Sequence, residues 1–334
     1  MADVAAAAGV SHQTVSRVLN EHSSVRESTR ERVLTAINAL GYRRNQAART
    51  LATNRSATIG IVATDTAHFG PSSTVLAVEQ AARDAHLFVS IATVASEDPG
   101  AAIDQLMNQG VDGIVVVAPH VEVARVLDTT PVRIPIVVIA ARTDAPTDTS
   151  VSYIAVDQAA GAASVADRLI DLGHHGLAHI AGPHDWFDAI ERSRGFISRA
   201  RERGAALHLA NAGGWSARRG YDAAKHLIDG VRDGSITAIF AANDYLAIGA
   251  LRALGEAGCS APDDVALVGF DDIEGSAFLS PSLATVRQPF ALIGTAAIEA
   301  LTGNPARSTF FSPELIERET LARHVATGAA HTHI

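Results

Sequence analysis

The chain has 334 residues, 47% of them hydrophobic, and a formal net charge of −9. This length fits two or three domains and this apolar content can bury a large core, which excludes a disordered chain. A single cysteine excludes an intrachain disulfide, and no apolar run approaches the ~20 residues of a membrane-spanning helix. No signal-peptide pattern opens the chain, so we expect a cytoplasmic protein without a membrane partner.

Charge is distributed unevenly along the chain. Residues 1–58 hold eight arginines against four carboxylates, a balance of +4, so the remainder carries −13. A basic segment on an acidic body indicates contact with nucleic acid through that segment alone. A chance excess of arginine on a solvated helix face would give the same count, so charge alone leaves both interpretations open.

Three short helices are predicted at the start of the chain. An alanine-rich helix over residues 3–8 ends at Gly9, and Ser11 is a suitable N-cap for the second helix. A third helix, capped by Ser28, ends at Gly41. Its apolar stripe consists of Val33, Leu34, Ile37 and Leu40. Two helices joined by a tight turn and braced by a third are the helix-turn-helix arrangement, although other small helical domains share this outline.

The second helix has two chemically different faces. At about 100° per residue, Val15, Val18 and Leu19 lie on one face. The opposite face is polar and carries His12, Gln13, Ser16, Arg17 and Asn20. Arginine pairs with guanine and glutamine with adenine, so this face can read bases in a major groove. The polar face of an ordinary surface helix is the alternative.

Residues 43–56, after Tyr42, are basic and include few apolar side chains. They are predicted to form a linker with weak helical character over residues 47–52. Isolated helices shorter than about 12–15 residues are marginal in water, so a helix here would need a partner to become stable.

From Thr58 onward, strand-like runs alternate with helical stretches such as 158–172 and 244–257, as in parallel α/β proteins. The predicted strands are 58–64, 87–93, 112–118, 134–140, 153–157, 177–182, 238–243 and 265–272. They are too many for one compact sheet, so we expect two doubly wound lobes. Ligands in such sheets bind beyond the carboxyl ends of the strands, where Asn243 and Asp271 fall.

Two sets of motifs run along the chain. The first set is DVAAAAGVSHQTVSRVLN and the basic segment after it. The second set consists of LGHHGLAHIAGP, GGWSARRGY, FAANDYLAIGALRAL, VALVGFDDIEGSAFLSPSLATVRQPF and LIERET. Through these motifs the chain resembles the lactose repressor (LacI) family over nearly its whole length. SHQTVSR and the tryptophan of GGWSA are most similar to the lactose-type repressors. The resemblance implies an all-α helix-turn-helix head and an α/β core of two parallel-sheet lobes, like that of periplasmic binding proteins.

The resemblance implies a homodimer that binds a pseudo-palindromic operator in double-stranded DNA. The side chains expected to read bases are His12, Gln13 and Arg17. Those expected to contact phosphates are Thr14, Ser16 and Asn20. In the hinge, Asn45 resembles a helix cap, and Ala48 and Leu51 resemble residues that enter the minor groove. Packing of Leu51 on the core is the alternative.

The resemblance also implies a sugar effector bound between the lobes. An aromatic platform would face the C–H groups of the sugar ring, and charged or amide groups would bond its hydroxyls. The expected effector-binding residues are Thr64, Pro71, Asp188, Arg192, Trp215, Asn243, Asp271, Gln288 and Phe290. For Trp215 and Phe290, a purely structural place in the core is the alternative. Residues 68–71 and Trp186 are also expected to reach this cleft, whereas Asp272 is expected to pair structurally and His174 and His175 to lie at the surface.

Three features depart from the family pattern. The chain begins Met1-Ala2-Asp3 where members carry several more residues, so we expect the true start to lie upstream. Ala140 stands where some lactose-type repressors present an effector-binding aspartate, which leaves the sugar open. No leucine-heptad tail follows the core, so a dimer is expected rather than a tetramer.

The expected domains are a head over residues 1–43, a hinge over 44–57 and a core over 58–334. Within the core, lobe 1 is expected to comprise 58–157 plus 288–312, and lobe 2 to comprise 158–287 plus 313–323. The predicted function is a dimeric repressor of sugar-utilisation genes, released by a galactoside or other glycoside. The close variant is a regulator that uses a co-repressor, a ligand that strengthens operator binding instead of weakening it.

Two functions from other classes compete with this prediction. A periplasmic-type sugar-binding protein shares the two-lobed core, but the basic head argues against it. A sugar-converting enzyme would need catalytic groups, and the chain lacks GxSxG, GxxxxGK[ST], HExxH, CxxC and a GxGxxG after its first strand. No enzyme, metal or cofactor is therefore expected.

Overall fold

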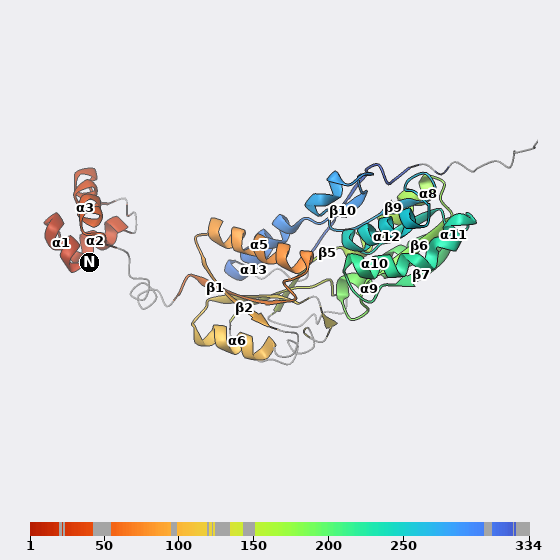
Figure 1. Ribbon diagram of the computed structural model, residues 1–334. Coiled ribbons are helices and arrows are strands. Elements are labelled where there is room, and N and C mark those ends of the chain that lie inside the picture. The colour runs from red at the N-terminus through yellow and green to blue at the C-terminus, as the bar shows by residue number, and fades with distance from the viewer. Residues whose placement is uncertain are drawn as a thin grey trace, which may run out of the picture. The chain divides into compact units, whose positions relative to one another are not determined.

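A computed structural model gives the fold of the chain (Figure 1). The residues that it describes are 1–19, 22, 24–42, 55–94, 99–118, 120–121, 123, 134–142, 151–303, 309–322 and 324. They form two compact units, Met1–Ser56 and Ala57–Ile334, and each is described by itself. Within the described residues, no helix has the length and apolar character needed to cross a membrane.

The described residues of the first unit form three helices around a small apolar core. They are α1 (Ala2–Ala8), α2 (His12–Leu19) and α3 (Glu27–Ala39). Gly9 ends α1 in the left-handed conformation at φ 62°, which glycine adopts without steric cost. The core consists mainly of Val4, Val15, Val18, Val33 and Ala36. The predicted helical head is therefore present, with α2 burying the apolar face that its sequence predicts.

Two details of α3 differ from the prediction. The helix begins at Glu27 after the N-cap residue Arg26, which makes no side-chain cap bond, so Ser28 lies inside the first turn. Leu34 and Leu40 are 45% and 50% exposed, and Ala36 is buried in their place. The helix therefore presents a narrower stripe to the core than its leucines indicate.

The second unit contains two α/β lobes, each built on its own parallel sheet. The sheet of lobe 1 has the order β11-β5-β4-β3-β1-β2. Its strands are β1 (Thr58–Thr64), β2 (Phe88–Val94), β3 (Gly113–Val117), β4 (Ile136–Ile139), β5 (Val151–Val156) and β11 (Thr309–Phe311). All of its pairs are parallel. A parallel sheet needs cover on both faces, which explains the continuous apolar runs of these strands.

The helices of lobe 1 supply that cover (Figure 1). Helices α5 (Phe69–Asp84) and α13 (Phe290–Thr302) pack together on one face through residues such as Val78 and Ile293. Helix α6 (Pro99–Asn108) packs on the other face through Ile103 and Leu106. Although α13 is far from the other two in sequence, it joins the first lobe, so the chain returns to lobe 1 after building lobe 2.

Lobe 2 has a four-stranded parallel sheet in the order β7-β6-β8-β9. Its strands are β6 (Gly176–Ala181), β7 (Ala206–Asn211), β8 (Ala238–Ala241) and β9 (Ala266–Val268). The helices are α8 (Gln158–Asp171), α9 (Phe187–Glu202), α10 (Ala217–Ala224), α11 (Ile228–Arg232) and α12 (Asp244–Glu256). Short 3-10 helices follow at Lys225–Leu227 and Glu274–Phe278. Helices α8 and α9 cover one face, and α10 and α12 cover the other.

A small antiparallel pair completes the unit, with β10 (Thr285–Arg287) against β12 (Glu314–Ile316). The expected class, a helical head and two doubly wound lobes, is confirmed. Every predicted apolar run contains a strand, but β7, β10, β11 and β12 were not predicted. The strand predicted over 265–272 is shorter, because β9 ends at Val268 and Asp271 and Asp272 follow in a turn.

Candidate functional site

Helix α2 of the head presents a polar surface. Val15 and Val18 are buried against α1 and α3, whereas His12, Gln13 and Arg17 are exposed. These three side chains can therefore reach an external partner without any rearrangement of the head. Their side chains, an imidazole, an amide and a guanidinium, can form hydrogen bonds with base edges.

The first turn of α2 is fixed by Ser11. Its hydroxyl accepts a hydrogen bond from the Thr14 N–H at 3.2 Å and bonds the Thr14 hydroxyl at 2.9 Å. Thr14 and Ser16 are half-buried, in keeping with a supporting position beside the exposed residues. Four predicted DNA contacts lie outside the described residues. They are Asn20, Asn45, Ala48 and Leu51.

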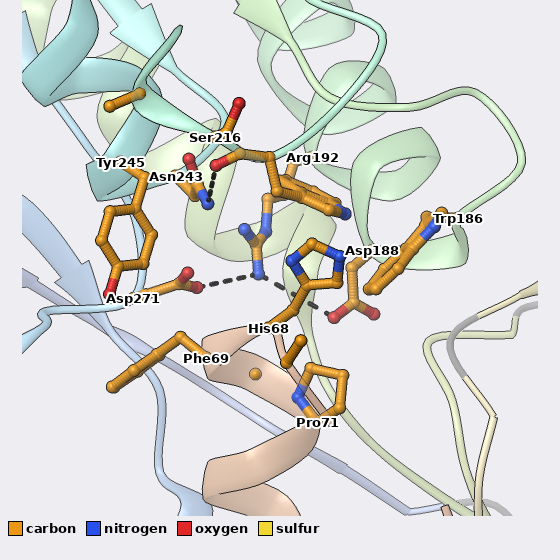
Figure 2. A pocket seen from close by; sticks show the side chains of 14 residues that line it. His68, Phe69, Pro71, Trp186, Asp188, Arg192, Ser216, Asn243, Tyr245 and Asp271 are labelled. Atoms are coloured by element: carbon orange, nitrogen blue, oxygen red, sulfur yellow. Dashed lines mark hydrogen bonds and ion pairs between the residues drawn. The ribbon is translucent and has the colours of Figure 1, made fainter. Parts of the chain in front are cut away.

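A cavity of about 330 Å³ lies between the two lobes of the core. The amino ends of α5, α9, α10 and α12 meet at it, so side chains from four separate elements converge (Figure 2). Its lining consists of Ala67, His68, Phe69, Gly70, Pro71, Trp186, Asp188, Arg192, Trp215, Ser216, Ala217, Asn243, Tyr245 and Asp271.

Arg192 lies at the centre of this cavity and is only 2% exposed. Its Nη1 donates to the carbonyl of Ala242 at 2.6 Å and its Nη2 donates to Asp271 Oδ1 at 3.3 Å. Asp188 Oδ2 lies 3.9 Å from Nη2, so the guanidinium lies between two carboxylates (Figure 2). Its Cζ is 3.8 Å from the ring centroid of Phe270. A buried charge is tolerated because it is paired and hydrogen-bonded in this way.

A chain of amides fixes the back of the site. Arg192 Nε donates to Gln158 Oε1 at 2.9 Å, Gln158 Nε2 donates to Gln288 Oε1 at 2.9 Å, and Gln288 Nε2 donates to Asp271 Oδ1 at 2.7 Å. Gln158 begins α8 in lobe 2, whereas Gln288 precedes α13 of lobe 1. These bonds therefore connect two of the three crossings between the lobes to the central arginine.

Burial dominates the acid–base chemistry of the two carboxylates. It raises the pKa of Asp271 to about 6, although the charge of Arg192 acts in the opposite direction. Burial likewise raises the pKa of Asp188, again against the influence of Arg192. Above neutral pH, Asp271 is an ionised acceptor held at a fixed place, which is the group that a ligand hydroxyl needs.

Aromatic rings form the wall beside this charged centre. Trp186 and Trp215 pack edge to face with centroids 5.4 Å apart, and His68 and His120 pack on Trp186 at 5.3 and 4.6 Å. Among the described residues, the buried indole N–H of Trp215 has no acceptor. A tryptophan face with polar groups beside it suits the alternating C–H and O–H surfaces of a sugar ring.

Asn243 and Tyr245 come from the start of α12. Asn243 is the N-cap of α12, because its Oδ1 accepts from the Leu246 N–H at 2.8 Å, and its Nδ2 donates to the Trp215 carbonyl at 3.2 Å. Half of its hydrogen-bonding capacity is therefore used to build the wall. Tyr245 is 43% exposed and its ring lies at the rim near Asp271 (Figure 2).

The cavity brings together most of the effector-binding residues expected from the sequence. Six line it: Pro71, Asp188, Arg192, Trp215, Asn243 and Asp271. Gln288 and Phe290 line an adjoining cavity of about 40 Å³, which Ala140 also borders. Thr64 lines neither of these two cavities, because it is fully buried and its hydroxyl donates to the Val117 carbonyl at 3.4 Å.

Two further predictions have clear outcomes. Asp272 pairs with Arg287 at 2.7 Å and Arg318 at 2.6 Å, as its expected structural role requires. The prediction for His174 was wrong, because this side chain is only 3% exposed and bonds the Ala322 carbonyl at 2.9 Å. The sequence offered no sign of that distant partner.

Ser216 and Tyr245 of the lining were not predicted. Ser216 caps α10 by accepting from the Arg219 N–H at 3.4 Å, so an N-cap signal could have placed it beside Trp215. Tyr245 had no signal beyond its nearness to Asn243. In the described part of the chain, no three metal-ligating side chains come together.

Two family models match the chain. Residues 1–45 match bacterial regulatory proteins of the lacI family, and residues 166–321 match a periplasmic binding protein-like domain. The transcriptional regulator CelR of Thermobifida fusca is 34% identical over 301 residues, which cover 87% of each chain. The chain belongs to the LacI family. It is thus a DNA-binding transcriptional regulator and not an enzyme, as predicted.

Other LacI-family proteins resemble it to a similar degree. The lactose operon repressor of Escherichia coli K12 is 32% identical over 304 residues, covering 90% of this chain and 82% of the repressor. The lac repressor dimer bound to operator and the anti-inducer ONPF has a TM-score of 0.82 at 30% identity, covering 96% and 98% of the two chains. The CelR–cellobiose complex has a TM-score of 0.68 at 29% identity, covering 95% and 98%.

Proposed function

We propose that this LacI-family regulator is a dimeric repressor that a sugar releases from its operator. The head binds a near-palindromic operator in the cytoplasm, one half-site per subunit. A galactoside or another glycoside binds between the lobes of the core and weakens that contact. The allosteric coupling of such systems is typically ~1–3 kcal/mol per site, and a dimer has two sites.

The observation that carries the sugar assignment is the composition of the cavity. A buried arginine between two carboxylates lies beside two tryptophans that face the same space. The polar groups suit hydroxyls and the indole rings suit the C–H face of a pyranose. Two relatives support the choice, since CelR is known with cellobiose and the lac repressor with ONPG.

The proposed domains separate DNA binding from effector binding. Residues 1–43 form the DNA-binding head, 44–57 a hinge, and 58–334 the effector-binding and dimerisation core. Lobe 1 comprises 58–157 plus 288–312, and lobe 2 comprises 158–287 plus 313–323. The effector residues that we propose are those expected from the sequence, with Thr64 in a supporting position behind the cavity.

The DNA-reading role of α2 is tested by a matched pair of arginines. Arg17→Ala removes a guanidinium from the exposed face of α2, and Arg32→Ala removes one from the exposed side of α3. We expect Arg17→Ala to lose about 1–3 kcal/mol of discrimination between an operator and scrambled DNA. Arg32→Ala should weaken both DNAs about equally or not at all. Equal discrimination by both variants, measured by fluorescence anisotropy, would remove Arg17 from base readout.

The sign of the ligand effect separates the proposed repressor from its close variant, a regulator that uses a co-repressor. A sugar that weakens operator binding supports the proposed repressor. A sugar that strengthens operator binding would make the ligand a co-repressor.

A further inference from the structure

Asp271 enters the cavity from a strained turn. After β9, the backbone of Asp271 and Asp272 adopts φ values of 109° and 53°, which side chains with a Cβ rarely adopt. Strained residues of this kind persist only where surrounding contacts hold them, and they gather at functional sites. The position of the Asp271 carboxylate therefore depends on what holds the turn.

The side chain that holds the turn is Asp244, the first residue of α12. Its carboxylate is fully buried and accepts three hydrogen bonds. The donors are the Ile273 N–H at 2.9 Å, the Ser276 hydroxyl at 2.6 Å and the Thr285 hydroxyl at 2.5 Å. The Thr285 oxygen in turn accepts from the Asp272 N–H at 3.2 Å. Asp272 and Ile273, on the C-terminal side of the strained turn, are thus connected to one carboxylate.

The backbone around Asp244 is shaped for the same contact. The Asp244 N–H donates to the Phe270 carbonyl at 2.8 Å, and the Asp271 N–H donates to the Val286 carbonyl at 2.8 Å. A Cβ at Gly269 would lie 2.1 Å from Asp244 Oδ1, so only glycine leaves room for the carboxylate beneath the turn. The turn is therefore fixed between α12 and β10.

We propose that Asp244 is a positioning residue for the effector site, which holds the turn that directs Asp271 toward Arg192 and does so best as an ionised carboxylate. The inference rests on the proposed function of the cavity. An ionised carboxylate offers an acceptor to each of the three donors. A proton on the carboxylate removes the charge that strengthens these bonds and makes one of the two hydroxyls turn from donor to acceptor.

The environment allows that proton to be gained near neutral pH. Burial, together with the charge of Asp271, raises the pKa of Asp244 to about 7. Asp271, with a pKa of about 6, becomes protonated at lower pH. The other charged or titratable groups that surround the pair are Arg192 and Asp188 of α9, His68 before α5, Tyr245 of α12, and Arg287 and Arg318, which pair with Asp272.

Two substitutions test the hydrogen bonds that the Asp244 carboxylate accepts. In Asp244→Asn, the amide oxygen accepts from Ile273 and the amide nitrogen donates to a reoriented hydroxyl, so the variant mimics the protonated carboxyl and retains the turn through weaker, uncharged bonds. Asp244→Ala removes every acceptor. With cellobiose and lactose as probes at pH 8, we expect a Kd about threefold weaker than wild type for Asp244→Asn and at least about tenfold weaker for Asp244→Ala.

A milder variant covers the case in which Asp244→Ala does not fold. Thr285→Val is nearly isosteric and removes only the hydroxyl that joins Asp244 to the turn. Its Kd is expected to lie between those of the other two variants. Wild-type affinity in both Asp244→Ala and Thr285→Val would overturn the inference.

The pH profile gives a readout that a merely structural residue would not change. As the pH falls from 8.5 to 5.5, sugar affinity of the wild type should decrease in two steps, near 7 and near 6. The Asp244→Asn profile should keep only the step near 6, which belongs to Asp271. Coincident profiles would overturn the inference.

A ligand-free measurement separates this inference from the proposed function. Both tryptophans of the chain line the cavity, so their emission reports on its shape without any sugar. Asp244→Ala should shift the emission maximum, whereas Asp244→Asn should not. If neither sugar binds the wild type, the proposed function fails for these ligands. If all three spectra coincide, the positioning role fails.

Discussion

At the scale of single residues, the proposed effector site depends most on Arg192. It joins Gln158, Asp271 and the Ala242 carbonyl, and it is buried with them. A guanidinium has five N–H donors in a fixed plane. These three bonds use one donor at each nitrogen, so Nη1 and Nη2 each keep one N–H for a further acceptor such as a ligand hydroxyl.

Replacing this arginine tests its double role. Arg192→Ala should lower sugar affinity at least about 100-fold and cost roughly 3–5 kcal/mol of unfolding free energy, because Asp271 is left buried without its cation. Arg218→Ala is the control, since its side chain is 80% exposed and pairs with Asp222 along α10. That change should stay within about 0.5 kcal/mol. Calorimetric titration and urea unfolding measure the two quantities, and sugar binding that survives in Arg192→Ala would contradict the site.

The buried acids predict how stability depends on pH. Asp244 and Asp271 have pKa values of about 7 and about 6 in the folded protein, against an ordinary 3.8. At pH values between 3.8 and about 7, the folded chain holds protons on these two carboxyls that the unfolded chain has lost. The unfolding free energy therefore falls as the pH rises toward 7. Asp244→Asn should therefore raise stability at pH 8 by roughly 1–3 kcal/mol and by less at pH 5. Asp222→Asn, on the surface of α10, should change neither value. Urea unfolding at the two pH values decides the point, and equal effects at both would contradict the assignment.

At the scale of elements, continuous apolar runs identified the strands that lie inside the sheets. β1, β3 and β4 are buried on both faces, so their sequences carry no alternation and are easy to find. β7 lies at the edge of its sheet and is mostly exposed or half-buried, and β10, β11 and β12 have three residues each. Such strands exist because of distant partners, and a local pattern cannot reveal them.

The candidate site could be predicted for a related reason. Its polar residues follow strands or begin helices in motifs of the LacI family, which places them at one edge of the sheets. Asp244 lies beside the predicted Asn243 and was still missed. Its role depends on Ser276 and Thr285, which are 32 and 41 residues away along the chain. Asn243 could be predicted from its place after a strand, whereas no local pattern predicted that the Asp244 carboxylate is buried.

The contact between α10 and α12 gives a prediction at this scale. A Cβ at Gly249 of α12 would lie 1.9 Å from the Ala217 carbonyl oxygen, so Gly249→Ala must push α10 away. We expect a loss of more than about 2 kcal/mol in stability and weaker sugar binding, since α10 begins beside Trp215. Gly255→Ala lies in the same helix with open space around it and should be neutral or stabilising by up to ~1 kcal/mol. Equal melting temperatures for the two variants would show that the helices are not in close contact.

At the scale of the whole molecule, the core has contacts between its lobes on both sides of the cavity. At the end of the cavity that Trp186 lines, the ring of His120 from lobe 1 packs on Trp186 of lobe 2. A bond of 2.7 Å to Asp65 of lobe 1 holds the His120 ring there. At the other end, Gln158 bonds Gln288. A ligand that contacts Trp186, Arg192 and Asp271 therefore touches the groups that join the lobes. This arrangement gives sugar binding a physical means of changing the angle between them.

The measurement that tests the account most directly is release of operator DNA by a sugar. A labelled palindrome from upstream of the gene for this chain would be titrated with protein at several salt concentrations, followed by anisotropy. Galactosides and glucosides, including lactose and cellobiose, would then be added. We predict tight binding whose log Kd changes with log salt by about 0.9 per phosphate contacted, and release by at least one sugar. DNA binding that no sugar changes, although a sugar binds the core, would contradict the account.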